Sequence, residues 1–347
     1  MNPLSVPASV FDLARRATLF LLFAALLLVI PAGVRAQQRD DVLTTDTSLV
    51  QLNVGVVDKQ GNSVTSLSRN DFAIYEDGVR RQIVSFEPTE APFSLVLLLD
   101  MSGSTVNFRQ QIRGAALRFL DALSPEDRVA VVQFSGKGVR SLFGFSTDRR
   151  RIAYAITDLA NGAGDTPLYE ALKFSVKELA REGKRRKAVV VLTDGLDTEV
   201  RNGDRAIVTK AAEDQVSTAI KAETNSQVVT VLNQADREGV TIFPLALPSG
   251  DPKRLPLPDP AITAMYQAAH VRLQLLAART GGRLHEIRSL DEMAKLYAQV
   301  AADLRALYTI AYQPANPGTH DGKWREIRVE IARADLVAST KPGYYAR

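Results

Sequence analysis

The sequence has 347 residues, of which 46% are hydrophobic and 24% charged, and it contains no cysteine. This length and hydrophobic content exclude a chain that is disordered throughout, and they suffice for one medium-sized domain and a smaller one. The lack of cysteine excludes disulfide frameworks and thiolate metal sites, and a formal net charge of only +4 argues against nucleic acid as a partner.

Residues 1–36 have the pattern of a secretory signal peptide. Two arginines precede the apolar run Leu19–Ile30, and Val34-Arg35-Ala36 has small residues at the positions that a signal peptidase recognises. We therefore predict cleavage after Ala36 and an exported protein, periplasmic or secreted. The alternative is an uncleaved membrane anchor, because Ala17–Val34 has roughly the length of a marginal span. Cleavage removes three Arg and one Asp and lowers the net charge to +2.

Residues 37–92 are predicted to form an N-terminal β segment. Apolar and polar side chains alternate in residues 50–56 and 72–76, and Asp77-Gly78 supplies a turn before residues 82–86. A period of two with an Asp-Gly turn indicates antiparallel strands.

Strand and helix patterns alternate from residue 93 to residue 305, which predicts a doubly wound, mostly parallel α/β sheet. The strand at Val139–Phe143 follows its neighbour through a short connection and is predicted to be an antiparallel edge strand. The other predicted strands are Ser94–Leu99, Arg128–Phe134, Ala188–Leu192, Val240–Leu245 and Arg283–Glu286. The predicted helices are Asn107–Leu123, Arg150–Leu159, Leu168–Glu182, Ser226–Glu238, Ile262–Thr280 and Leu290–Leu304.

A period of two returns in residues 306–347, a C-terminal β segment that cannot extend the parallel sheet without a crossover helix. We predict that it pairs with the N-terminal β segment, so that the α/β domain is inserted in, or flanked by, a small antiparallel β-sandwich. The alternative is two independent small β units, whose few strands would form poor cores.

Several polar segments interrupt the α/β pattern. Glu199–Asn225 is predicted to be a polar insertion, and the proline-rich Pro248–Pro260 to be an exposed, non-helical loop. Both are candidates for binding specificity, with ordinary loop variation as the alternative. The basic clusters Arg149–Arg151 and Lys184–Lys187 are predicted to be solvated helix and loop ends rather than a polyanion site.

The most informative residues follow the apolar strands. Asp100, Ser102 and Ser104 come directly after one buried strand pattern, and Asp194 comes after another. Thr166 precedes a predicted helix and is expected at its N-cap, with Pro167 at the first helical position. Ligands gather at the carboxyl ends of strands in open α/β sheets, and sets of oxygen ligands suit a hard cation such as Mg²⁺.

This constellation resembles the metal-ion-dependent adhesion site of von Willebrand factor type A domains, whose pattern is Asp-x-Ser-x-Ser, a distant Thr and a distant Asp. The resemblance covers residues 92–305. It implies direct coordination of Mg²⁺, Mn²⁺ or Ca²⁺ by Ser102, Ser104 and Thr166, with Asp100 and Asp194 acting mainly through water.

The nearly complete mature chain also resembles a group of exported bacterial proteins related to this family. That resemblance rests on the stretch Asp71–Gly78 and on the closing Pro-Gly-Tyr-Tyr at residues 342–345.

These patterns favour a metal-dependent, adhesion-type module that is not an enzyme. Its cation would capture a carboxylate of a protein partner, because neutral hydroxyl ligands leave much of the cation's charge uncompensated. The alternatives are a hydrolase that uses the ion as a Lewis acid, and an assembly scaffold in which the ion only stiffens loops. Nucleic acid is not an expected partner, and a membrane is expected only if the N-terminal segment is retained.

Overall fold

A computed structural model describes residues 49–346 of the protein, except for residues 61, 90, 184, 248–258 and 288–292. The predicted signal segment therefore lies outside the described residues, as does most of the predicted proline-rich loop. Among the described residues, no helix combines the length and the apolar character needed to cross a membrane.

The larger part of the fold is a six-stranded sheet with the strand order β10-β9-β8-β5-β6-β7. Neighbouring strands are parallel except for β7, which runs antiparallel to β6 at the edge. All eight residues of β5 are buried, as expected for a strand covered on both faces. The strands are β5 (Phe93–Asp100), β6 (Arg128–Ser135), β7 (Gly138–Ser146), β8 (Arg186–Thr193), β9 (Val240–Ala246) and β10 (His285–Glu286).

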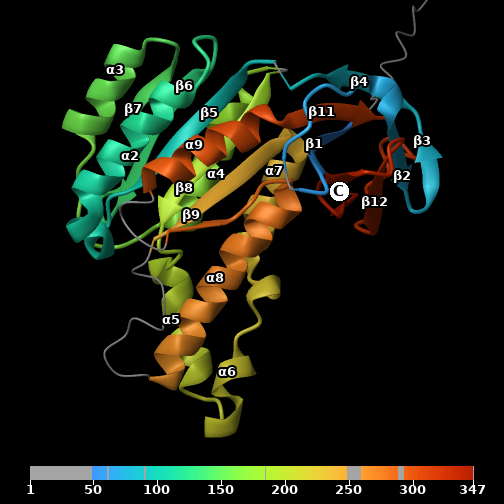
Figure 1. The fold of residues 1–347 in the computed structure, drawn as a ribbon. Helices are drawn as coiled ribbons and strands as arrows, with labels where there is room; N and C mark the ends of the chain where they lie inside the picture. The colour runs from blue at the N-terminus through green and yellow to red at the C-terminus, as the bar shows by residue number, and fades with distance from the viewer. Residues whose placement is uncertain are drawn as a thin grey trace, which may run out of the picture. The chain divides into compact units, whose positions relative to one another are not determined.

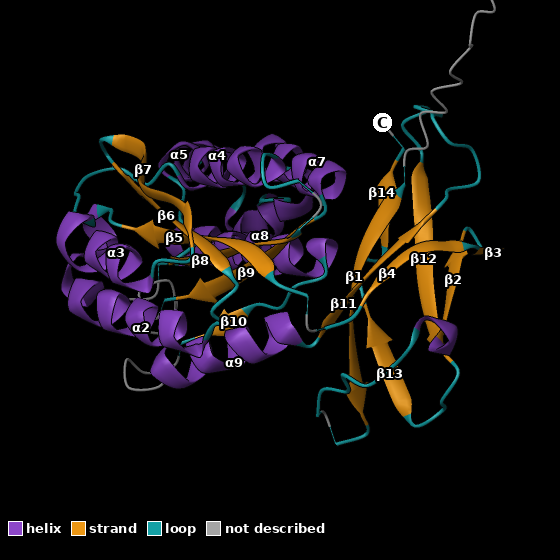
Figure 2. Ribbon diagram, turned by 90° about the horizontal axis from the view of Figure 1, so that it is seen from above, coloured by secondary structure: helices purple, strands orange, loops and turns teal. Residues whose placement is uncertain are grey.

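Helices cover both faces of this sheet (Figure 2). One hydrophobic core contains α2 (Arg109–Ala122), α3 (Arg149–Tyr154) and α9 (Met293–Arg305). The other contains α4 (Leu168–Ala180), α7 (Ser226–Glu238) and α8 (Pro260–Thr280). Two short helices adjoin these: η2 (Gly103–Phe108) directly precedes α2, and the π-helix η3 (Ala155–Leu159) directly follows α3.

Two antiparallel sheets form a β-sandwich, with the orders β13-β1-β11-β4 and β14-β12-β2-β3. Both sheets combine strands from the two ends of the chain, which alternate in the first sheet and meet between β12 and β2 in the second: Leu52 pairs with Ile310, and Ile74 with Val329. The elements are β1 (Val50–Asp58), η1 (Arg69–Asp71), β2 (Phe72–Glu76), β3 (Val79–Arg81), β4 (Ile83–Glu87), β11 (Leu307–Tyr312), β12 (Trp324–Ile331), β13 (Leu336–Ser339) and β14 (Gly343–Tyr345). The predicted fold class, a doubly wound α/β domain flanked by a small antiparallel β-sandwich, is confirmed.

The side chain of Arg186 lies where the chain passes between these two parts, and it is only 1% exposed. Its guanidinium donates hydrogen bonds to the carbonyl oxygens of Thr89 (2.7 Å) and Leu304 (2.9 Å), and also to that of Leu307. It lies 4.0 Å from the ring centroid of Phe93. The prediction that residues 184–187 form a solvated cluster is therefore wrong for Arg186, because carbonyl groups distant in sequence satisfy its buried charge.

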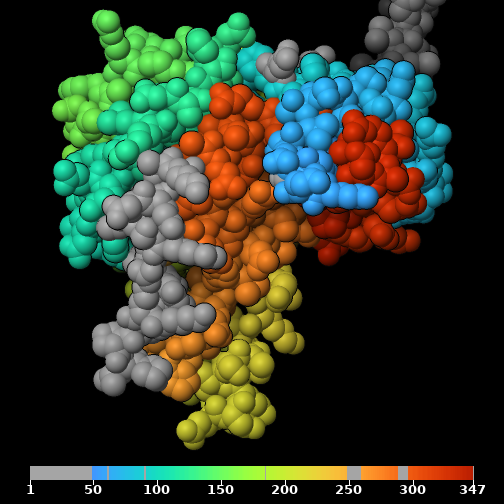
Figure 3. Space-filling view, viewed as in Figure 1, coloured from blue at the N-terminus to red at the C-terminus, as the bar shows by residue number. Residues whose placement is uncertain are grey.

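The predicted polar insertion at residues 199–225 is largely helical. It contains α5 (Thr198–Val208), η4 (Glu213–Gln215), α6 (Val216–Ala219) and η5 (Ala222–Thr224). Figure 1 and Figure 3 show the region of α6 and the adjoining part of α8 standing out beyond the sheet. At the end of the predicted proline-rich loop, Asp259 caps α8 and Pro260 is already its first residue.

Candidate metal centre

Two neighbouring parallel strands bring Asp100 and Asp194 to the same edge of the sheet. Leu99 of β5 is paired in register with Leu192 of β8, so Asp100, the last residue of β5, is level with Thr193, and Asp194 follows one residue later. Asp100 is 0% exposed and Asp194 is 5% exposed. This position is the crevice outside the strand ends where open α/β sheets bind ligands.

Asp100 organises the loop that follows β5. One carboxylate oxygen, Oδ1, accepts a hydrogen bond from the backbone N–H of Ser102 at 3.0 Å, and Oδ2 accepts one from the hydroxyl of Thr193 at 2.8 Å. The hydroxyl of Thr105 donates to the Asp100 carbonyl at 2.8 Å. Thr193 and Thr105 were not predicted from the sequence, although Thr193 is adjacent to Asp194.

The two serines lie side by side at the mouth of the site. The hydroxyl oxygens of Ser102 and Ser104 are 3.2 Å apart, with Ser102 buried and Ser104 exposed. The hydroxyl of Ser104 also interacts with the carboxylate of Asp194 and lowers its pKa. The candidate ligands therefore extend from the buried carboxylates of Asp100 and Asp194 to the exposed hydroxyl of Ser104.

Thr166 belongs to a glycine-rich loop that packs against the loop of the serines. The N–H of Gly103 donates to the carbonyl of Gly164 at 2.9 Å. A β-carbon added at Gly162 would lie 2.7 Å from the Met101 carbonyl oxygen, so only glycine permits this approach. The backbone N–H of Thr166 donates to the hydroxyl of Thr198 at 2.9 Å, while its side-chain hydroxyl forms no hydrogen bond with a described residue.

The expected N-cap assignment of Thr166 is wrong by one residue. Helix α4 begins at Leu168, and Pro167 occupies the N-cap position, so Thr166 precedes the cap. Thr166 therefore does not cap α4. In the first turn of α4, the N–H of Tyr169 instead donates a hydrogen bond to the carboxylate of Asp197 at 3.2 Å.

The electrostatics of the two carboxylates favour a bound cation. Burial and the proximity of Asp194 raise the pKa of Asp100 to about 7. Burial also raises the pKa of Asp194, whose Oδ2 atom is buried and accepts no hydrogen bond from a described residue. A divalent cation would relieve both the repulsion and the unsatisfied oxygen.

The donors present fit Mg²⁺ or a similar hard cation, because every candidate ligand is a hydroxyl or carboxylate oxygen. Within the described part of the chain, no group of three or more His, Asp or Glu side chains is placed to hold a metal ion elsewhere. The constellation of Asp100, Ser102, Ser104, Thr166 and Asp194 is therefore the candidate metal centre.

Two arginines and a tyrosine that were not predicted from the sequence lie near this centre. Arg109 of α2 donates to the carbonyl of Met101 at 3.3 Å and to that of Gly162, and so joins the two loops. Arg201 of α5 lies close enough to lower the pKa of Asp194, and Tyr266 of α8 lies near both. The position of Arg201 depends on the fold of residues 198–225, which was not predicted from their polar composition.

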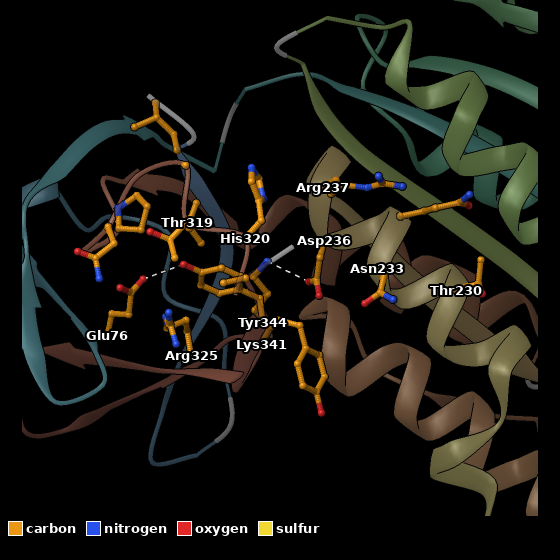
Figure 4. A pocket seen from close by; sticks show the side chains of 18 residues that line it. Glu76, Thr230, Asn233, Asp236, Arg237, Thr319, His320, Arg325, Lys341 and Tyr344 are labelled. Atoms are coloured by element: carbon orange, nitrogen blue, oxygen red, sulfur yellow. Dashed lines mark hydrogen bonds and ion pairs between the residues drawn. The ribbon is translucent and has the colours of Figure 1, made fainter. Parts of the chain in front are cut away.

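A separate cavity of about 430 Å³ lies between α7 and the β-sandwich (Figure 4). Its charged groups largely satisfy one another: Lys341 binds Asp236 at 3.0 Å, and the carboxylate of Glu76 accepts hydrogen bonds from Tyr312 (2.8 Å) and Tyr344 (3.0 Å). None of the five candidate metal ligands lines this cavity. Its polar contacts connect the sandwich to α7.

Residues 95–196 match the family model described as von Willebrand factor type A domain. Comparison with curated proteins yields no match. Similar solved structures include the conserved hypothetical protein BatB from Bacteroides thetaiotaomicron, with 15% identity, a TM-score of 0.42, and coverage of 61% of this chain and 98% of that one.

A von Willebrand factor type A protein from Catenulispora acidiphila has 15% identity and a TM-score of 0.46, covering 81% of this chain and 74% of that one. The vWF domain of the type V pili tip protein Mfa5 from Porphyromonas gingivalis has 14% identity and a TM-score of 0.45, covering 61% of this chain and 94% of that one.

Proposed function

The chain carries a von Willebrand factor type A domain in residues 95–196, and on that premise we propose that it is an exported, metal-dependent protein-binding module. In this proposal the five candidate ligands hold Mg²⁺, and the ion captures a carboxylate of a protein partner. The proposal makes the protein a binding module rather than an enzyme, located in the periplasm or outside the cell.

The observation that carries the proposal is the pairing of two buried carboxylates beneath an exposed hydroxyl. Asp100 and Asp194 are nearly inaccessible to solvent, whereas Ser104 is exposed at the mouth. A cation held there would be reached by a partner from the side of Ser104. Hydroxyl ligands are neutral, so the ion would keep much of its charge for an incoming anion.

The first experiment measures whether the site binds metal. Protein freed of metal by chelation is titrated calorimetrically with Mg²⁺ and Mn²⁺, alongside Thr166→Ala and Asp194→Asn. We expect one binding site in the wild type and at least a tenfold weaker one in each variant. Equal binding by Asp194→Asn would overturn the assignment of the site.

The second experiment tests capture. Immobilised wild type is exposed to a native envelope extract in Mg²⁺ or in chelator, and to the same extract after amidation of its protein carboxylates. We expect retention of a partner only in Mg²⁺ and only before amidation. Retention that survives chelation, with the metal site intact, would favour the scaffold alternative.

A further inference from the structure

Helix α5 presents a stripe of polar and basic side chains that begins at the candidate metal centre. At 3.6 residues per turn, Thr198, Arg201, Asn202 and Arg205 lie on one side of the helix. Lys210 follows the end of α5, and together with Asn202 and Arg205 it lines a shallow hollow of about 390 Å³. We call Arg201, Arg205 and Lys210 the α5 basic face.

The α5 basic face is held in a fixed position relative to Thr166. The N–H of Thr198 donates to the carbonyl of Thr166 at 3.0 Å, and the hydroxyl of Thr198 accepts from the N–H of Thr166 at 2.9 Å. On the buried side of the helix, Asp204 forms a bidentate ion pair with Arg272 of α8. The first turn of α5 is therefore anchored to the metal-site loop, and the second turn to α8.

The α5 basic face has few intramolecular anions. Arg201 lies close enough to Asp194 to lower the pKa of that carboxyl, but among the described residues no carboxylate is within ion-pair distance of Arg201, Arg205 or Lys210. The Nε atom of Arg201 is buried and donates no hydrogen bond to a described residue. Arg205 and Lys210 are exposed, so incoming acceptors can reach them.

We propose that the α5 basic face binds additional carboxylates of the same partner, so that the recognised segment is an acidic peptide rather than a single acidic side chain. This inference rests on the proposed function, in which the first carboxylate binds the metal ion. Carboxylates that follow it in the partner would pair with Arg201, then with Arg205 and Lys210. Arginine and lysine side chains suit this role because they form charge-assisted hydrogen bonds with carboxylates, which are stronger than hydrogen bonds between neutral groups.

The dimensions of the α5 basic face set the spacing of acidic residues in the segment. Arg201 and Arg205 are four residues apart in α5, which corresponds to roughly 6 Å along the helix. An extended peptide covers about 3.3 Å per residue, so two residues of the peptide match this spacing. Alternate residues of an extended strand point to the same side. The best ligand is therefore a segment with acidic residues at every second position.

The α5 basic face is short, which argues for a peptide over a polyanion such as nucleic acid or an anionic membrane. Glu199 lies two positions before Arg201 and so faces another side of the helix, while Glu213 and Asp214 follow shortly after Lys210. These acidic residues limit the positive surface to a few residues. A polyanion would need a broader positive surface.

The test uses two fluorescein-labelled peptides in Mg²⁺, one with three Glu residues at alternate positions separated by Ser, and one with only the first Glu. Fluorescence anisotropy gives both dissociation constants for the full chain and for the double variant Arg205→Gln/Lys210→Gln, which changes the two exposed cations beside the hollow. The matched control is Arg140→Gln/Arg150→Gln, which removes two exposed arginines from β7 and α3. Mn²⁺ titration of each protein verifies that the metal site is intact.

We expect the three-Glu peptide to bind about 5- to 20-fold more tightly than the one-Glu peptide in the wild type and in the control. In Arg205→Gln/Lys210→Gln this gain should fall at least about twofold, while the one-Glu peptide binds as before. A gain that persists in that variant overturns the inference and leaves metal-dependent capture standing. Binding of neither peptide by metal-loaded protein overturns both proposals.

Equal displacement of the three-Glu peptide by a short single-stranded DNA or by anionic vesicles would also overturn the inference, because it would identify a general polyanion surface. We expect neither competitor to displace the peptide at matched charge concentration and physiological salt.

Discussion

The guanidinium of Arg272 in α8 donates two hydrogen bonds to the carboxylate of Asp204 in α5, at 2.6 and 2.7 Å, and both side chains are nearly inaccessible to solvent. This ion pair lies behind the α5 basic face. The ion pair holds α5 against α8, and the buried side chains of Val200 and Val208 add apolar contacts.

Removal of one partner should therefore loosen α5. We expect Asp204→Asn to lower the free energy of unfolding by about 3 kcal/mol, since the Arg272 cation loses its buried counter-charge. Amide hydrogen exchange should localise the change to α5, where protection falls. The double variant Asp204→Leu/Arg272→Met, which removes both charges, should recover most of the stability; unchanged protection of α5 in Asp204→Asn would contradict this account.

The same ion pair explains why α5 was not predicted from the sequence. Val200, Asp204 and Val208 recur at intervals of four, which is a helical period, but the central position is acidic. Its counter-charge lies 68 residues later in the chain. A pattern that depends on a distant partner cannot be distinguished locally from an exposed polar loop.

Asp100 and Asp194 could be predicted because both follow uninterrupted apolar strands, and parallel strands deliver such residues to one edge of the sheet. Thr193 and Arg201 could not, since their contacts with the two aspartates arise only after the strands and α5 have packed. The basic residues 184–187 were predicted to be solvated for a related reason. Three of the carbonyl acceptors of Arg186 belong to Thr89, Leu304 and Leu307.

Arg186 is consequently a strong candidate for a stability defect. Lysine retains the charge but cannot reach carbonyl oxygens on both connecting segments at once. We expect Arg186→Lys to lower the free energy of unfolding by about 2–4 kcal/mol, measured by urea denaturation. The exposed Arg150→Lys serves as the control and should change it by less than about 0.5 kcal/mol. A loss no greater than that of the control would show that the buried hydrogen bonds contribute little.

Mg²⁺ and the substitution Asp100→Asn should have opposite effects on stability. Without metal, the repulsion between the buried carboxylates of Asp100 and Asp194 opposes folding, so the variant should be more stable than the wild type by on the order of 2 kcal/mol. At an Mg²⁺ concentration 100-fold above the dissociation constant, the wild type should gain about 2.7 kcal/mol and the variant very little.

Thermal unfolding in chelator and in Mg²⁺ measures this crossover. Asp214→Asn, which changes an exposed aspartate outside the candidate centre, should respond to Mg²⁺ as the wild type does. Equal stabilisation of Asp100→Asn and wild type by Mg²⁺ would place the cation elsewhere.

Substitution of Gly162 tests whether metal binding depends on the position of the loop that contains Thr166. A β-carbon at this residue would lie 2.6 Å from the β-carbon of Ser135 and 2.7 Å from the Met101 carbonyl oxygen, so Gly162→Ala must displace the loop from its neighbours. A displacement of even 1 Å moves the Thr166 hydroxyl away from the serines, and we expect Mn²⁺ affinity to fall at least about tenfold. The control is Gly114→Ala in α2, where a β-carbon meets no atom within 4 Å and alanine should stabilise the helix by up to about 1 kcal/mol. Wild-type Mn²⁺ affinity in folded Gly162→Ala would mean that Thr166 is not a ligand, because its loop would then be free to move without consequence.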